Sequence, residues 1–121
     1  MAVAGAAPTN WAEDYNISDS NVADRYSFRG SPWLGDNMKD YIAQSSITYA
    51  AQIKTPTLIL SDTGDARVPI AQSYQLYHAL KDNGVPVKFI AYPVPGHEPG
   101  DPIRFRDVDR RWLGWLDEYL K

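Results

Sequence analysis

The fold of this chain is decided by the stretch Thr57-Leu-Ile-Leu-Ser-Asp-Thr-Gly-Asp-Ala-Arg-Val-Pro69. Its first half is a short apolar run that is entered through Pro56 and left through aspartate and glycine. This pattern is typical of a buried parallel strand that ends in a turn. In open α/β sheets, ligands and catalytic groups gather beyond the carboxyl ends of the strands, because the loops converge there. Asp65 lies in that turn, so we take it as a candidate functional residue.

A second buried strand is predicted over residues 87–92, and the loop Pro93-Val-Pro-Gly-His97 follows it. A carboxylate therefore follows one strand and an imidazole follows the next. In nucleophilic hydrolysis, a carboxylate orients the imidazole, and the imidazole takes a proton from a serine. Asp65 and His97 supply two of these three groups.

The other predicted elements complete an α/β pattern. They are a strand over 2–6, a long connection over 9–35 with one helical turn at most, a short helix over 36–44, a turn over 45–52, a helix over 70–83 and a terminal helix from 105. Strands that alternate with helices indicate an α/β fold with a parallel sheet, here of about three strands. At 121 residues, the chain is expected to form a single domain.

Two amphipathic helices are expected to cover this sheet. The first has its apolar stripe at Ile70, Tyr74, Tyr77 and Leu80 and ends at Gly84, with His78 off the stripe at the surface. The second repeats apolar residues at helical spacing, at Phe105, Val108, Trp112, Leu116 and Tyr119.

Charge and composition argue against several classes of function. The net charge is −3, and the twelve lysines and arginines are scattered, which argues against nucleic-acid binding. The chain has no cysteine and no apolar run of the roughly 20 residues that a membrane span needs. We therefore expect a soluble protein without a membrane partner, and the lack of a signal peptide pattern and of cysteine favours the cytoplasm.

The segment 9–45 forms an aromatic loop region. Its larger rings are Trp11, Tyr15, Tyr26, Phe28 and Trp33. Aromatic side chains commonly serve packing, so these rings are expected to pack on the sheet or, alternatively, to form a substrate wall.

The first predicted strand has no neighbour on its outer side. A bare strand edge presents unpaired N–H and C=O groups that another chain can use. We therefore expect a homo-oligomer, a homodimer joined near Ala2 to Ala6, with the strands antiparallel about a two-fold axis.

Several motifs together resemble the end of the catalytic domain of the prolyl oligopeptidase family, in particular its acylaminoacyl peptidase and dipeptidyl aminopeptidase-like members. The matching segments are Ser46-Ile-Thr-Tyr-Ala50, Ile53-Lys-Thr-Pro-Thr-Leu-Ile-Leu60, Gly64-Asp-Ala-Arg-Val-Pro69, Gln72-Ser-Tyr-Gln-Leu-Tyr77 and Pro93-Val-Pro-Gly-His97. The resemblance covers most of the chain.

The resemblance implies part of an α/β-hydrolase fold, in which the triad follows the chain order serine, acid, histidine. Asp65 then corresponds to the acid and His97 to the general base. Residues 1–121 would form one partial domain of that fold, and residues 56–121 would carry both groups as strand, helix, strand and helix.

The family's nucleophile is not matched. Its serine lies in a Gly-x-Ser-x-Gly pentapeptide upstream of the matching segments, and this chain has no such pentapeptide. Gly30-Ser31-Pro32 lacks the second glycine and the strand-to-helix context, and Ser61 has little to favour it. The backbone donors of the oxyanion hole belong to the unmatched part of the family's domain as well.

Two functions remain open. The chain is either the acid–base portion of a serine hydrolase that cleaves peptide or ester substrates, or a noncatalytic, truncated remnant that self-associates and at most binds small ligands. Neither requires a cofactor. A metal is not expected, because the acidic residues near His97 lack the spacing of a metal site.

Overall fold

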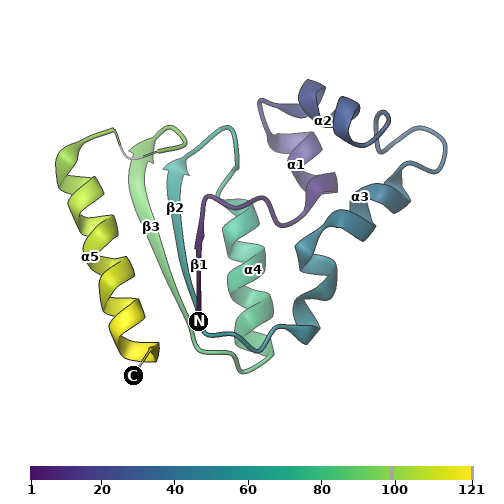
Figure 1. The fold of residues 1–121 in the computed structure, drawn as a ribbon. Coiled ribbons are helices and arrows are strands. Elements are labelled where there is room, and N and C mark those ends of the chain that lie inside the picture. The colour runs from purple at the N-terminus through teal and green to yellow at the C-terminus, as the bar shows by residue number, and fades with distance from the viewer. Residues whose placement is uncertain (99, 121) are drawn as a thin grey trace.

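The structure, a computed structural model, describes residues 1–98 and 100–120. Three parallel strands, β1 (Ala2–Gly5), β2 (Thr57–Gly64) and β3 (Val87–Pro95), form one open sheet with β2 in the centre (Figure 1). The predicted α/β class with three parallel strands is therefore confirmed. Thr57 pairs with Ala2 on one side and with Val87 on the other. The strands thus start together, and their carboxyl ends open at the same edge.

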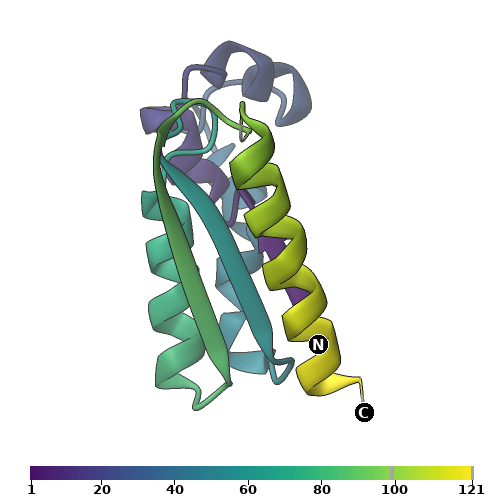
Figure 2. The same ribbon diagram turned by 90° about the vertical axis from the view of Figure 1, so that its left-hand side faces the viewer.

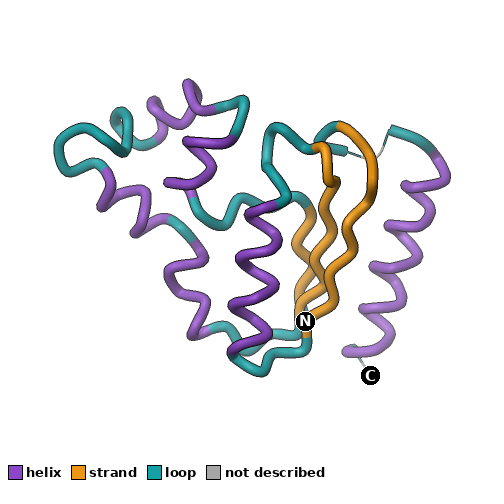
Figure 3. Tube along the Cα trace, turned by 180° about the vertical axis from the view of Figure 1, so that it is seen from behind, coloured by secondary structure: helices purple, strands orange, loops and turns teal. Residues whose placement is uncertain are grey.

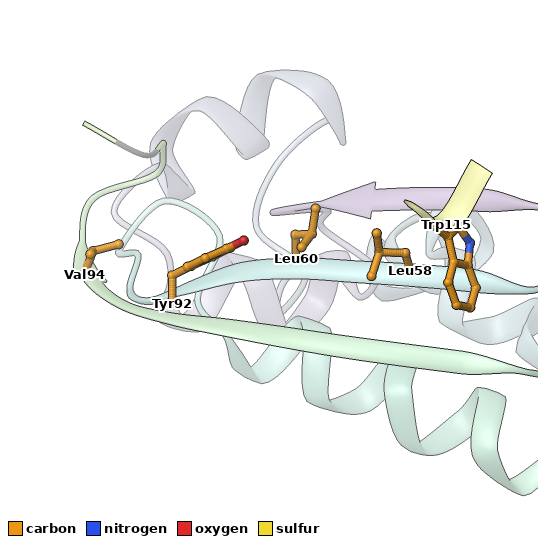
Figure 4. Packing of buried hydrophobic residues seen from close by; sticks show 5 residues of the cluster. All are labelled: Leu58, Leu60, Tyr92, Val94 and Trp115. Atoms are coloured by element: carbon orange, nitrogen blue, oxygen red, sulfur yellow. The ribbon is translucent and has the colours of Figure 1, made fainter. Parts of the chain in front are cut away.

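Helices cover both faces of the sheet. α4 (Ala71–Asp82) packs on one face and α5 (Pro102–Tyr119) on the other (Figures 1 and 2). Successive residues of β2 alternate between the two cores, as the period of a strand requires. Ile59 packs on the α4 side, whereas Leu58 and Leu60 pack with Tyr92, Val94 and Trp115 on the α5 side (Figure 4).

The connection between β1 and β2 is more helical than predicted. Residues 9–35 contain two helices, α1 (Trp11–Ile17) and α2 (Asn21–Ser27), instead of one helical turn at most. The predicted short helix is present as α3 (Met38–Gln44), and the predicted turn that follows it is the 3₁₀ helix η1 (Ser46–Gln52). These helices lie beside α4 and away from α5 (Figure 3). We call residues 11–27 the α1–α2 lobe.

The sequence did not predict the two helices of the lobe because they are short. A helix of two turns shows no sustained apolar period, so only its end signals remain in the sequence. Asn10 provides such a signal at α1, where its side chain accepts a hydrogen bond from the Glu13 N–H. A separate aromatic core joins the lobe to Phe28 and to α3. It is formed by Tyr15, Phe28 and Tyr41.

The predicted stripes of the two covering helices need correction. In α4, Leu76 and Leu80 are buried, but Tyr74 is 47% exposed and Gln72 is fully buried. The first turn of α4 therefore buries polar groups against the chain that leaves β1. In α5, Trp115 is the buried indole and Trp112 is 43% exposed. His78 is exposed, as expected.

β1 remains an open edge in the described part of the chain, because it pairs with β2 alone. None of the helices within residues 1–98 and 100–120 combines the length and the apolar character that a membrane span requires.

Candidate active site

Asp65 follows the central strand directly, in the turn between β2 and α4. Its Oδ1 accepts hydrogen bonds from the backbone N–H groups of Arg67 at 2.8 Å and Val68 at 2.9 Å. These two bonds fold the loop around the carboxyl group and fix its orientation. Because Oδ1 is fully used by the loop, Oδ2 is the oxygen that points to a partner.

That partner is His97, which follows β3. Its Nδ1 lies 2.8 Å from Asp65 Oδ2. A carboxylate accepts hydrogen bonds, so we assign the imidazole proton to Nδ1. Nε2 then carries the lone pair that can take a proton. The Asp65 side chain is fully buried and the His97 side chain is 43% exposed, so the acid is shielded while the imidazole remains accessible.

Two glycines bring the loops that carry these residues together. Gly64 ends β2, and a Cβ atom there would lie 2.9 Å from the Cα of Pro95, closer than atoms normally approach. Gly96 has a φ of +97°, which favours glycine over other residues. The loops before Asp65 and before His97 can therefore approach closely because Gly64 lacks a side chain, and Gly96 permits the turn that leads to His97.

A cavity of about 380 Å³ adjoins His97 at the carboxyl ends of the strands. Its apolar lining includes Leu60, Tyr92, Phe105, Val108 and Trp112. Trp112 is therefore a wall of this cavity, which explains why it is not in the core. A cavity of about 450 Å³ lies at the other end of the sheet, near the start of β3, and contains neither Asp65 nor His97. We place the candidate site at the cavity beside His97, because His97 lines it and contacts Asp65.

The two serines weighed from the sequence form hydrogen bonds with residues other than His97. Ser61 is 4% exposed, and its hydroxyl shares a hydrogen bond with that of Ser73. Ser31 accepts a hydrogen bond from the Trp33 N–H. Among the hydrogen bonds of the described residues, the His97 side chain bonds to Asp65 and not to a hydroxyl group.

Acidic groups surround the Asp65–His97 pair. Burial raises the pKa of Asp62, and the charge of Asp65 raises it further. Burial and the charges of Asp24 and Asp65 raise the pKa of Asp14 to about 6. Within residues 1–98 and 100–120, no three histidine, aspartate or glutamate side chains gather as metal ligands.

The link between α1 and α2 forms hydrogen bonds with the loop that carries Asp65. The sequence did not predict this contact. The Asp19 N–H donates to the Ala66 carbonyl at 2.9 Å, and the Ser18 hydroxyl donates to the Arg67 carbonyl at 2.6 Å. Arg67 Nε also forms an ion pair with Asp19 at 2.6 Å. Arg67 belongs to the stretch 57–69 that decides the fold, but no pattern in the sequence near Asp19 predicts its contact with Arg67.

Comparisons with known proteins extend these observations. The sequence profile of the Prolyl oligopeptidase family matches residues 1–121. The chain is 38% identical over 97 residues to the acylamino-acid-releasing enzyme of Mus musculus, an alignment that covers 75% of this chain and 13% of that enzyme. It is 31% identical over 93 residues to dipeptidyl-peptidase 5 of Aspergillus fumigatus, covering 76% of this chain and 13% of that protein.

Solved structures show the same similarity. The uncomplexed acylaminoacyl peptidase of Pyrococcus horikoshii superposes with a TM-score of 0.84 at 25% identity, over 96% of this chain and 20% of that one. A crystal structure of dipeptidyl peptidase 4 from Porphyromonas gingivalis superposes with a TM-score of 0.75 at 24% identity. The chain spans about an eighth of the length of the curated relatives named above.

Proposed function

Because the chain belongs to the prolyl oligopeptidase family, we propose that it carries the acid and the base of a serine hydrolase that cleaves peptide or ester bonds. The family consists of hydrolases of the serine-peptidase type with an α/β-hydrolase fold. The observation that carries the proposal is the 2.8 Å contact between Asp65 Oδ2 and His97 Nδ1 at the carboxyl ends of adjacent strands.

In this mechanism, His97 Nε2 takes the proton of a serine hydroxyl while the serine oxygen attacks the carbonyl carbon of the substrate. The resulting imidazolium is stabilised by Asp65, which keeps its charge. His97 then gives the proton to the leaving amine or alcohol, and an acyl-enzyme remains. Water, deprotonated by His97, attacks the acyl carbon, and the bond from that carbon to the serine oxygen breaks. His97 returns the proton to the serine oxygen, which restores the hydroxyl and frees the carboxylic acid. The two backbone bonds to Asp65 Oδ1 hold the acid in place through these steps.

The serine and the oxyanion donors come from outside the matched motifs, since the sequence has no Gly-x-Ser-x-Gly pentapeptide. The apolar cavity beside His97 offers room for part of a substrate or for the segment that carries the serine. Residues 1–121 serve in this proposal as one partial domain of the fold.

The alternative is a noncatalytic module that self-associates. The observation that favours it is the open outer edge of β1, where Ala2 to Ala6 would pair with a second copy. Sedimentation over a dilution series is expected to show a dimer that dissociates at low concentration. A monomer at every concentration would rule this pairing out.

Hydrolysis of a short-chain p-nitrophenyl ester tests the catalytic proposal. His97→Ala and Asp65→Asn are each expected to lower the rate by on the order of a thousandfold or more. His78→Ala, which changes an exposed histidine on α4, is the matched control and is expected to keep the rate. A rate that is unchanged in both site variants would refute the roles of Asp65 and His97. No hydrolysis by the unmodified chain would mean that the pair is idle without a serine from outside the matched motifs.

A further inference from the structure

The α1–α2 lobe buries two carboxyl groups that the proposed reaction does not use. Asp14 on α1 is 2% exposed and Asp24 on α2 is 7% exposed. Asp14 Oδ1 and Asp24 Oδ2 are buried, and neither has a hydrogen-bond partner among the described residues. A buried carboxylate without partners is strongly disfavoured, whereas the neutral acid is tolerated far better. The lobe therefore disfavours the ionised form of both carboxyl groups, and burial raises the pKa of each.

The charges around Asp14 act in the same direction. Burial is the largest cause that raises its pKa, followed by the negative charges of Asp24, Asp65, Glu13 and Asp19. The cations nearby are already engaged, since Arg25 donates to the Tyr15 hydroxyl at 2.9 Å and Arg67 pairs with Asp19. On α3, the charged residues pair at the surface and Tyr41 faces the lobe. These pairs are Arg29 with Asp40 and Lys39 with Asp36.

The lobe is tied to the loop that carries Asp65. The bonds from the Asp19 N–H to Ala66 and from the Ser18 hydroxyl to Arg67 join the end of α1 to that loop. A change in the packing of α1 therefore reaches residues 65–68 directly.

We propose that the α1–α2 lobe is a pH-sensitive element, packed against the Asp65 loop while Asp14 is protonated and loosened when Asp14 ionises. The lobe would thus pack tightly against the Asp65 loop in acid and loosen towards neutral pH. This proposal does not depend on the catalytic role of Asp65 and His97.

The direction of the effect follows from proton linkage. The pKa of Asp14 rises from 3.8 to about 6 in the folded protein, so the fold binds this proton more tightly than the unfolded chain does. The stabilisation is fully present below pH 3.8 and is lost as the pH rises to about 6. Over this window, the ratio of folded to unfolded protein is expected to fall on the order of a hundredfold through this group alone.

The experiment compares the unmodified chain with Asp14→Asn, which keeps the shape of the neutral acid. Thermal unfolding midpoints are measured between pH 4.5 and pH 7.5. The midpoint of the unmodified chain is expected to fall on the order of 10 °C more than that of Asp14→Asn across this range. Asp117→Asn, which removes an exposed carboxylate from α5, is the control and is expected to follow the unmodified chain.

Two measurements on the unmodified chain keep the test independent of that variant. The carboxyl carbon of Asp14 is expected to titrate near pH 6 in NMR spectra. Hydrogen-exchange protection factors, corrected for the intrinsic effect of pH, are expected to fall for the Asp19 amide between pH 5 and pH 7.5. A carboxyl carbon that titrates near pH 4, or a lobe whose protection does not change, would overturn the proposal.

Discussion

Replacing Gln72 with alanine is expected to lower the free energy of unfolding by about 3 to 4 kcal/mol. Gln72 is fully buried at the start of α4. Its Oε1 accepts from the backbone N–H groups of Thr9 at 2.8 Å and Asn10 at 2.7 Å. Its Nε2 donates to the Asn10 carbonyl and to Glu13 Oε2, both at 3.1 Å. One side chain thus closes the junction between β1 and the α1–α2 lobe.

The magnitude comes from the groups that would lose their partner. The Thr9 N–H belongs to a residue that is 3% exposed, so leaving this N–H without a hydrogen-bond partner costs about 2 kcal/mol. The Asn10 N–H is half-buried and can partly turn to water, which gives about 1 kcal/mol. Lost packing of the glutamine stem adds up to about 1 kcal/mol. The sum is a large share of the roughly 5 to 15 kcal/mol that typically separates folded from unfolded domains.

Urea unfolding followed by circular dichroism measures this change. Gln75→Ala is the matched control. Gln75 follows Gln72 by about one helical turn on α4, is half-buried and also forms a hydrogen bond with Glu13. The control is expected to lose less than about 1 kcal/mol. If Gln72→Ala lost no more than Gln75→Ala, the junction would be held by something other than the Gln72 hydrogen bonds.

Three further predictions test the fold, and two of them have a control variant. Gly64→Ala is expected to lower the free energy of unfolding in urea by about 1 to 3 kcal/mol, because its Cβ would lie 2.9 Å from the backbone of Pro95. Gly114→Ala, on the open surface of α5, is the control and is expected to raise the free energy of unfolding by about 0.5 to 1 kcal/mol. Leu80→Ala, at a fully buried position, is expected to lose about 2 to 5 kcal/mol, and Leu113→Ala, at a position 61% exposed, less than about 0.5 kcal/mol. Hydrogen bonds from two arginines and a tyrosine lower the pKa of Asp107, so its stabilisation is present above pH 4 and lost as the pH falls below it. Thermal midpoints between pH 2 and pH 5 are therefore expected to fall less steeply in Asp107→Asn than in the unmodified chain, and equal slopes would contradict this assignment.

The sequence predicted the strand layout and the place of the acid and the imidazole. This succeeded because a parallel strand carries its own signals, an apolar run bounded by proline, glycine and aspartate. Two adjacent parallel strands deliver the residues that follow them to one edge, so Asp65 and His97 were expected near each other before any distance was known. Their catalytic roles remain a proposal.

Other features depend on contacts that a sequence does not display. The stripe of α4 was misjudged because the buried face of its first turn is polar, and Gln72 is buried for its hydrogen bonds rather than for its apolar surface. Trp112 was expected on the apolar stripe that packs on the sheet, but it lines the cavity beside His97, and Trp115 is the buried tryptophan. The burial of Asp14 went unnoticed, since an aspartate in a short polar segment normally indicates surface.

The pairing register of β2 has a consequence for the order in which the chain folds. Thr57 pairs with Val87 across a single helix, but it pairs with Ala2 only after the whole segment from α1 to η1 has been enclosed. Closing a shorter loop loses less chain entropy, and proteins rich in local contacts fold faster. The β2–α4–β3 unit is therefore expected to form first, with β1 and the lobe docking afterwards. Asp65 and His97 both follow strands of the early unit, so their contact would be made before the late step and would survive slow docking of the lobe.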